Sequence, residues 1–494
     1  MEHKTFTACT SHTGMRIVIA IAAYEGRLLY AADAINAFAQ SGPLDKPCYV
    51  IVDEAFREWY YERTKIMLPL NALIELTSSI QGHPDAGGNW QTKCNTTLKD
   101  LGWDRLVHEP CLYRRGNDVK DDVIMCRQID DKLFAVYEHG HFVGIVDELK
   151  GHMNIEGEKD LCTGYNGCEI DQRNEYIAIR VQKYILALVD TYGWSQENYS
   201  KTPKAPLSET LAKEIAAAGK GPPSRSPEGV LIQNEMGFSY RALLGALIFA
   251  CVVVRLDIAY SLSLLSRYAE YPARVHYLGL KSVTKYLRTT ADRAIVYWRR
   301  VPRTDLKDGD IFPLPEPSEY TYPYPEDPYL VGASVDASHA TCLETRRSTG
   351  GHVIILFGAA INWMAKLQPI VGTSSTEAEF MQAVLVSKAV KWVRYIMKEL
   401  GRKQIGPSPI GEDNKAAIMM VNQQRPTTRT RHIDTQWFAI QEWKQLGDIL
   451  LTYIKTGNNP SDALTKALGT VLHHRHCARA MGHYGSPYAG NMKE

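Results

Sequence analysis

The sequence lacks paired cysteines, a long apolar run and an excess of charge of one sign, and each absence excludes a class of protein. No CxxC pair occurs among the ten cysteines, so we expect no zinc site and reduced, mostly buried thiols in an intracellular protein. The apolar stretches at 17–23 and 243–254 are shorter than the roughly 20 residues that span a bilayer. Residues 1–14 also lack the order of a signal peptide. We therefore expect no membrane partner and a cytoplasmic or nuclear location.

The net charge of the chain is only +1. Proteins that neutralise phosphates with Lys and Arg are usually more basic, so the overall charge argues mildly against nucleic acid as a partner. The overall charge does not exclude a local basic groove that binds nucleic acid. The 494 residues, 45% of them hydrophobic, suffice for about three globular domains.

Two stretches are rich in residues typical of linkers. Residues 201–226 are rich in Pro, Lys, Ala and Ser, and residues 302–328 contain seven prolines. We interpret both as linkers that pack no core. The predicted divisions are 1–200, the linker 201–226, a helical segment 227–301, the linker 302–328, a domain at 329–470, and a tail at 471–494.

Apolar spacing predicts an α/β fold. In the first segment, strands are expected at 28–33 and 48–52, a helix at 88–101, and a strand–turn–strand unit at 122–136. The second segment has helical spacing throughout. In the third, strands are expected at 330–335, 351–357, 360–364 and 449–454, with helices at 375–400 and 415–421.

Four acids in the third segment stand at the predicted ends of strands or starts of helices. Asp336 follows an apolar strand, Glu379 lies in the first turns of the long helix, Asp413 follows a short strand, and Asp462 precedes the last helix. If they converge, the carboxylates repel one another unless divalent cations bind them. Oxygen ligands suit two Mg²⁺ or Mn²⁺ ions, which could activate water against a phosphodiester. Taken singly, each acid is more simply a cap or turn residue.

A second acidic group is predicted in the first segment. Asp130 and Asp131 lie between two apolar strands, and Asp33 ends an earlier strand. Adjacent residues on a flat strand point to opposite faces, so both members of the pair can reach one metal site only at a tight turn. Polymerases hold two Mg²⁺ ions with three carboxylates in such an arrangement. A DD pair on a solvated loop is the alternative.

Ordered sequence blocks resemble the reverse transcriptase and ribonuclease H region of copia-type LTR retrotransposon Pol polyproteins. The resemblance covers about residues 15–468. The nuclease blocks are RRSTGG, INWMAKLQP, SSTEAEF, EDNKAAI, TRTRHID and NPSDALTKAL, and the polymerase blocks include DAINAFAQSGPLDKPCYV, IQGHPDAGGNW, LGWDRLVHEPCLY, CRQIDD and RLDIAYSLSLLSRY.

The resemblance implies a polymerase palm followed by a helical connection and an α/β ribonuclease H-like domain. It implies that Asp33, Asp130 and Asp131 are polymerase metal ligands and that Asp336, Glu379, Asp413 and Asp462 are nuclease metal ligands. Of the two acids in the SSTEAEF block, Glu379 rather than Glu377 is expected to face the site, because helix residues two apart do not share a face. It further implies that Phe38 lies under the incoming sugar and that Gln81 and Gly82 lie beside the nucleotide and template.

Departures from the family pattern concern mainly the polymerase. Gln128 stands where the family usually has an aromatic residue, and the Lys132 ammonium next to the acidic pair is expected to compete with Mg²⁺. The family's preceding fingers segment does not occur before residue 15. We therefore predict weak or absent DNA synthesis.

The implied partners are RNA, DNA, RNA–DNA hybrids and deoxynucleotides, with other polyprotein parts or an oligomer, in a virus-like particle if the element is active. A catalytically inactive relic that binds nucleic acid is the alternative. The HHRHC sequence at 473–477 is interpreted as part of a solvated tail.

Overall fold

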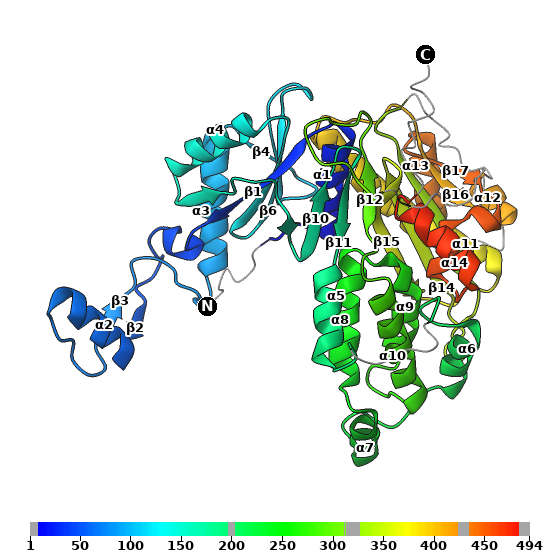
Figure 1. Cartoon of the computed structure of the whole chain (residues 1–494). Helices are drawn as coiled ribbons and strands as arrows, with labels where there is room; N and C mark the ends of the chain where they lie inside the picture. Colours follow the sequence, from blue (N-terminus) through cyan, green and yellow to red (C-terminus); the bar gives the residue numbers. More distant parts are fainter. Residues whose placement is uncertain (1–7, 196–202, 311, 313–326, 423–433, 484–494) are drawn as a thin grey trace. The chain divides into compact units, whose positions relative to one another are not determined.

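A computed structural model of the chain describes residues 8–195, 203–310, 312, 327–422 and 434–483 (Figure 1). Helices and four sheets are mixed along the chain, so the predicted α/β class is confirmed. The described residues form two compact units. One contains residues 8–11 and 30–161, and the other contains residues 12–29 and everything described from 162 onward. The described residues of the expected linkers at 201–226 and 302–328 fall within the second unit, whereas residues 201–202, 311 and 313–326 lie outside the described residues.

The first unit is built on a six-stranded sheet in the order β4-β5-β6-β7-β1-β8. β6 and β7 form a tight hairpin in which Gln128 pairs with Asp131, so the hairpin predicted at 122–136 is confirmed. β1 lies between β7 and β8, which brings its end next to the hairpin turn. The strands are β1 (Leu28–Ala34), β4 (Asp104–Arg105), β5 (Leu112–Arg115), β6 (Val123–Gln128), β7 (Asp131–Val136) and β8 (Ile155–Gly157).

Two helices supply the apolar cover of this sheet. α4 (His139–Lys150) contributes Phe142, whose ring lies 4.9 Å from that of Tyr30 and 5.6 Å from that of Phe134. α3 (Ala86–Asp100), the helix predicted at 88–101, contributes the fully buried Trp90. These aromatic side chains anchor the sheet that carries the acidic residues.

A small module between β1 and α3 has almost no core. It contains the short helix η1 (Ala37–Gln40), the two-stranded sheet of β2 (Tyr49–Ile51) and β3 (Leu73–Glu75), and α2 (Glu54–Thr64). α2 has no buried residue. A two-stranded sheet and an eleven-residue helix are each marginal alone. The module is therefore weakly stabilised by its own contacts.

The second unit contains a helix from the N-terminal part of the chain. α1 (His12–Tyr24) is buried from Thr13 onward, including the apolar stretch at 17–23. Arg16 is held by the carbonyl oxygens of Ile361, Val252 and Val253 at 2.7–2.8 Å. α1 packs against β11, β12 and β15. The strands beside it are β9 (Gly164–Tyr165), β10 (Cys168–Gln172), β11 (Tyr176–Arg180) and β12 (Ile295–Trp298), in the order β12-β11-β10-β9.

Residues 201–226, predicted to be a linker without a core, instead contain a packed helix. α6 (Glu209–Ala218) is capped by the Ser208 hydroxyl, which accepts from the Leu211 N–H, and its Ile215 is fully buried. The Ala-rich segment is a good helix former with one apolar face, so it packs on α10. The helical segment predicted at 227–301 is confirmed up to Thr289, whereas Ile295–Trp298 is the strand β12. Its helices are α7 (Pro227–Met236), α8 (Tyr240–Val253), η2 (Leu256–Ile258), α9 (Ala259–Ser266) and α10 (Arg274–Thr289), and α5 (Gln182–Thr191) precedes them.

The C-terminal part of the second unit is a five-stranded sheet in the order β15-β14-β13-β16-β17. β15, β14 and β13 are antiparallel, whereas β13, β16 and β17 run parallel. β14 is buried along its whole length, as expected for a strand covered on both faces. The elements are β13 (Val331–Ser338), β14 (Thr349–Leu356), β15 (Ala359–Leu367), α11 (Ser375–Glu399), β16 (Ser408–Glu412), α12 (Lys415–Asn422), α13 (Asp434–Gln445) and β17 (Ile449–Tyr453).

The HHRHC sequence does not lie in a solvated tail, contrary to the prediction. It lies in the middle of α14 (Thr470–Ala480), where His473, His476 and Cys477 are buried. His473 lies 3.4 Å from the Tyr286 hydroxyl of α10. The prediction failed because α14 packs against the short helix at Pro460–Leu464, β15 and η2, which bury these side chains.

Among the described residues, no single helix is both long enough and apolar enough to cross a membrane. Only Pro227–Met236 and Tyr240–Val253 taken together have that length and apolar character, and a 60° bend separates them.

Candidate metal centres

Three of the four acids predicted in the C-terminal domain come together. Asp336, Glu379 and Asp413 each offer a carboxylate oxygen, and these oxygens lie within 4.8 Å of one another. The sheet register explains part of this arrangement. Ser334 pairs with Gly411 between β13 and β16, so Asp336 and Asp413 each lie two residues further along, on the same face. α11 delivers Glu379 in its second turn.

The start of α11 is fixed by caps that also separate its two acids. The Ser374 hydroxyl accepts a hydrogen bond from the Glu377 N–H, and the Glu377 carboxylate accepts from the N–H and hydroxyl of Thr373. Glu377 is therefore a capping residue, consistent with its negative charge near a helix N-terminus. Glu379 is left to face Asp336 and Asp413, as predicted.

Asp462 lies beside Asp336 but outside the three-carboxylate group. It belongs to the short helix η5 (Pro460–Leu464), which is tied to β13 by a 2.7 Å hydrogen bond between the Ser461 and Ser334 hydroxyls. The Lys466 ammonium lies 3.1 Å from Asp462 Oδ2 and 3.9 Å from Asp336 Oδ2. The Thr465 hydroxyl also donates to Asp336 Oδ2.

Burial and mutual repulsion make these acids hard to ionise together. Burial, followed by the neighbouring Glu412, Asp336 and Asp413, raises the pKa of Glu379 to about 11. Burial and Asp336 raise the pKa of Asp462 to about 7. Such a cluster is stabilised as carboxylates only when positive charge is supplied.

The chemistry of the donor set fits divalent metal ions. All donors are carboxylate oxygens, the ligands preferred by hard cations such as Mg²⁺ and Mn²⁺. Glu379 Oε2 and Asp462 Oδ1 are buried and have no hydrogen-bond partner among the described residues. Buried, unpaired carboxylate oxygens are costly, and a bound cation would offset that cost.

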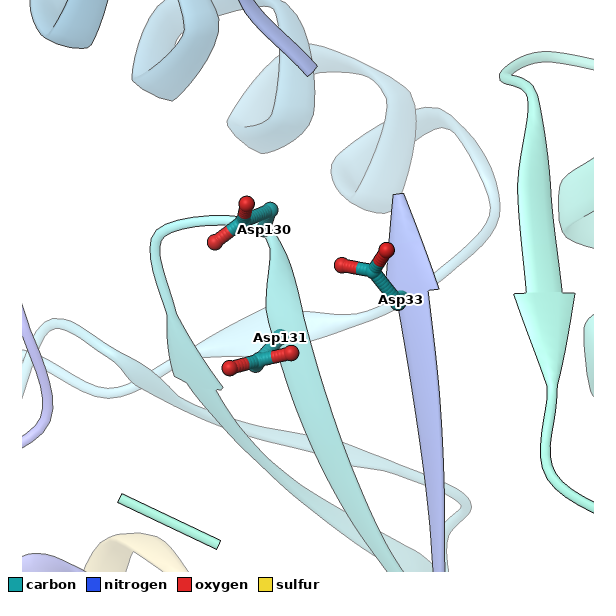
Figure 2. A group of neighbouring side chains, drawn as sticks. All are labelled: Asp33, Asp130 and Asp131. Carbon is teal, nitrogen blue, oxygen red and sulfur yellow. The ribbon is translucent and has the colours of Figure 1, made fainter. Parts of the chain in front are cut away.

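A second acidic group forms in the first unit, and Figure 2 shows its three side chains at the end of β1 and at the β6–β7 turn. Asp33, Asp130 and Asp131 are exposed and offer oxygens within 4.8 Å of one another. The Ala34 N–H donates to the Asp130 carbonyl at 3.3 Å, which joins the strand end to the turn. Ile129 has a positive φ of 57°, so the turn is tight enough for both members of the pair to approach one site, as predicted.

The Lys132 ammonium contacts the backbone of the acidic pair rather than its carboxylates, and its charge still acts to lower the pKa of Asp131, in the direction of the predicted competition. The Lys132 side chain is fully buried, and its ammonium donates to the backbone carbonyl of Asp130 at 2.9 Å. Because Lys132 follows Asp131 on β7, it points to the opposite face of the sheet. Partial burial, with Asp130 and Asp33, raises the pKa of Asp131, so the exposed group also favours a bound cation.

The other predicted polymerase residues lie in the same unit but on different elements. Phe38 is half-buried in η1, after Asn36 with its left-handed backbone. Gln81 and Gly82 are exposed in the turn before α3. Gln128 ends β6, and its side-chain oxygen is buried with no hydrogen-bond partner in the described part of the chain.

Sequence reasoning missed three residues at the C-terminal centre. Glu412 is fully buried, and burial raises its pKa to about 8. Thr465 and Lys466 contact Asp336 through hydrogen bonding and charge. The signals were present, since Glu412 adjoins Asp413 and Lys466 follows Asp462 by four residues. Neither spacing alone shows that the residue lies at the metal centre.

Comparison with known proteins agrees with this geometry. Residues 2–206 match the family described as reverse transcriptase (RNA-dependent DNA polymerase). The chain is 25% identical to the retrovirus-related Pol polyprotein from transposon TNT 1-94 of Nicotiana tabacum over 470 residues. The aligned region covers 94% of this chain and 32% of that protein. The chain is 24% identical to the Pol polyproteins from transposons RE2 and RE1 of Arabidopsis thaliana, over 95% and 94% of this chain and 28% of each relative.

The chain therefore contains a reverse transcriptase-family region, whose members generally use divalent metals and act on nucleic acid. More specifically, about 94% of the chain is similar to copia-type retrotransposon Pol polyproteins, which confirms the predicted resemblance. It spans about a third of the length of the curated relatives it matches.

Proposed function

We propose that the C-terminal domain is a ribonuclease H, which hydrolyses the RNA strand of an RNA–DNA hybrid with Mg²⁺ or Mn²⁺. The observation that carries this proposal is the convergence of Asp336, Glu379 and Asp413 from β13, α11 and the end of β16. The buried, unpaired oxygens of Glu379 and Asp462 support cation binding at the same place. Hybrid recognition would depend on backbone shape and 2′-hydroxyls rather than on base sequence.

The proposed roles follow from position. Asp336, Glu379 and Asp413 would hold the divalent metal, together with Asp462, which lies beside Asp336. Bound divalent ions supply an activated water and stabilise the charge on the leaving oxygen. The carboxylates of the chain would hold those ions in a fixed arrangement and orient the phosphodiester between them. Thr465 would keep Asp336 in place through its hydroxyl.

The direct test is cleavage of a labelled RNA–DNA hybrid by the full chain in Mg²⁺ and in Mn²⁺. We expect cleavage of the RNA strand only, and loss of cleavage in Asp413→Asn. Duplex DNA and single-stranded RNA are the substrate controls. A folded chain that binds the hybrid and leaves its RNA intact under both metals would instead indicate an inactive relic.

RNA-directed DNA synthesis is the second proposed activity, and the group of Asp33, Asp130 and Asp131 favours it. These acids would hold two divalent ions against the phosphates of a deoxynucleotide, with Phe38 near the sugar. We expect synthesis to be weak. Gln128 replaces the usual aromatic residue, and the module that includes α2 has little core to fix its position.

Primer extension on an RNA template tests this second activity. A weak Mg²⁺-dependent signal should disappear in Asp130→Asn. The control is Asp118→Asn, which makes the same substitution in the loop before β6, away from the acidic group. Robust extension by the parent chain would contradict the expected impairment. Partners of the active protein would be RNA, DNA and other parts of the polyprotein, in an intracellular setting.

A further inference from the structure

Lys466 occupies an unusual place for a positive charge. Its ammonium lies 3.1 Å from Asp462 Oδ2 and 3.9 Å from Asp336 Oδ2, between two nearly inaccessible carboxylates. The Lys466 side chain itself is 40% exposed. It reaches these acids from the solvent side.

The ammonium divides the carboxylates into two parts. On one side, Asp336, Glu379 and Asp413 form a group whose carboxylate oxygens lie within 4.8 Å of one another. On the other side, Asp462 is paired with Lys466, and Asp336 is common to both parts. Asp462 Oδ1, the oxygen opposite the one nearest the ammonium, is buried and has no hydrogen-bond partner in the described structure. The ion pair therefore satisfies Asp462 only in part.

We propose that Lys466 is an internal counter-cation that competes with a divalent ion for Asp336 and Asp462. This inference rests on the proposed nuclease function, because it assigns a role within that site. A divalent ion cannot bind these two oxygens while the ammonium stays between them, since like charges at about 4 Å repel strongly. The exposed lysine stem allows the ammonium to leave toward solvent or toward a phosphate of bound nucleic acid.

Two consequences follow for the unloaded protein. The ammonium stabilises the buried pair when no metal is present, so the fold does not depend on metal to offset those charges. The same ammonium weakens binding of the ion next to Asp462, while binding at the Glu379–Asp413 side is less affected. The site would bind its two ions with unequal affinities.

The test measures Mn²⁺ binding to the full chain without nucleic acid, by electron paramagnetic resonance of free Mn²⁺. Asp130→Asn and Asp131→Asn are present in every sample, so that the acidic group of the first unit does not contribute. In Lys466→Gln, we expect the weaker of the two classes of Mn²⁺ sites to tighten about tenfold or more. Lys466→Arg, which keeps the charge, should bind as the parent does.

The matched control is Lys398→Gln, an exposed lysine in the last turn of α11, 19 residues beyond Glu379 and hence roughly 28 Å along the helix. It should leave Mn²⁺ binding unchanged. A thermal unfolding series provides a second readout. Without metal, Lys466→Gln should unfold at a lower temperature than the parent, and Mn²⁺ should raise its unfolding temperature by more. If Lys466→Gln does not fold, Lys466→Met keeps the apolar stem and takes its place.

Unchanged or weaker Mn²⁺ binding in a folded Lys466→Gln would overturn the inference. The proposed nuclease is judged separately, by hybrid cleavage in the parent chain. Tightened Mn²⁺ binding without cleavage would retain the counter-cation and reject the nuclease. Cleavage by the parent with no change in Mn²⁺ binding would retain the nuclease and reject the counter-cation.

Discussion

Asp336 on β13 and Gly351 on β14 are direct cross-strand partners, and the missing side chain of Gly351 leaves the space that η5 fills. A Cβ at Gly351 would lie 2.8 Å from Leu464 Cβ and 2.9 Å from Thr465 Cγ2. Because directly paired residues share a face of the sheet, Asp336 and the η5 residues meet at this point. The glycine is thus a packing requirement of the candidate nuclease centre.

Gly351→Ala is expected to displace η5 and with it Thr465 and Asp462. Overpacking of this kind typically costs about 1–3 kcal/mol in the free energy of unfolding. Urea unfolding would measure that loss, and hybrid cleavage should fall with it. Gly457→Ala is the control, because a Cβ there meets no atom within 4 Å. Equal stability of the two variants would show that η5 adjusts without cost.

The two glutamates at the start of α11, Glu377 and Glu379, should have different functions. Glu379→Gln is expected to abolish hybrid cleavage, because it removes a charge from the three-carboxylate group. Glu377→Gln should retain cleavage and lower stability by about 0.5–2 kcal/mol, as its carboxylate only caps the helix. Cleavage rates and chemical unfolding of both variants check the assignment. A folded Glu377→Gln variant that does not cleave the hybrid would contradict the assignment of Glu377 as a capping residue.

Trp90 should stabilise the turn of the acidic hairpin. Its indole N–H donates to the Ile129 carbonyl at 2.8 Å, just before Asp130. Trp90→Phe leaves that carbonyl without its partner, so the free energy of unfolding should fall by about 1–3 kcal/mol. Trp59→Phe, at a tryptophan that is 45% exposed on α2, should change stability by less than about 0.5 kcal/mol. Chemical unfolding followed by circular dichroism distinguishes the two.

Asp257 should be among the most sensitive positions in the connection helices. It accepts two hydrogen bonds from Arg255, at 2.9 and 2.7 Å, and one from the Tyr286 hydroxyl, and both charges are fully buried. Burial alone would raise the pKa of Asp257, but Arg255 and Arg293 hold it well below its usual range. Asp257→Asn leaves Arg255 buried without its countercharge, at an expected cost of about 3–5 kcal/mol.

The comparison for Asp257 is the ion pair between Asp305 and Arg303, in which the Asp305 side chain is 57% exposed. Asp305→Asn should cost no more than about 1 kcal/mol, because solvent screens that pair. Thermal or urea unfolding of both variants measures the difference. Similar losses would mean that the buried network has an alternative partner for Arg255.

His276 predicts a loss of stability in mild acid. Its Nδ1 accepts a 2.8 Å hydrogen bond from the Ala273 N–H, and its ring stacks on Tyr268 at 4.0 Å. Burial lowers the pKa of His276 to about 4. Between pH 6.5 and 4 the unfolded chain binds a proton that the folded chain does not, so stability falls as the pH falls. The loss in the free energy of unfolding that His276 causes reaches about 3 kcal/mol near pH 4.

Unfolding in urea at several pH values measures this effect. His276→Gln should reduce the loss of stability between pH 6.5 and 4, and the remaining loss belongs in part to His352, His473 and His483, whose pKa values burial also lowers to about 4. His141→Gln, at an exposed histidine on α4, should leave the dependence as in the parent. An unchanged slope in His276→Gln would assign the acid sensitivity to other groups.

Local sequence signals predicted most elements that carry the acids. The β6–β7 hairpin has apolar strands on both sides of its turn, and α11 has both a Ser374 cap and a long apolar face, so each is specified by neighbouring residues. The grouping of Asp336, Glu379 and Asp413 also followed once strand and helix ends were assigned. The TRTRHID block, apart from the start of α13 at Asp434, lies outside the described residues.

What the sequence did not predict depends on distant partners. α6 and α14 were read as linker and tail because their own composition is weakly apolar, yet the connection helices bury Ile215 and His473. Lys132 was expected beside carboxylates, but tertiary packing beneath the turn holds its ammonium against a backbone carbonyl. The contacts of Lys466 likewise arise only when η5 is docked on β13.

The burial of α1 has a consequence for biosynthesis. This helix leaves the ribosome well before two of the strands that cover it, because β12 and β15 are made about 270 and 340 residues later. At typical elongation rates of about 5–20 residues per second, its apolar face waits on the order of tens of seconds for those partners. During that interval the nascent chain presents Ile17, Val18, Ile19 and Ile21 to solvent, which favours binding by chaperones before the C-terminal metal centre can assemble.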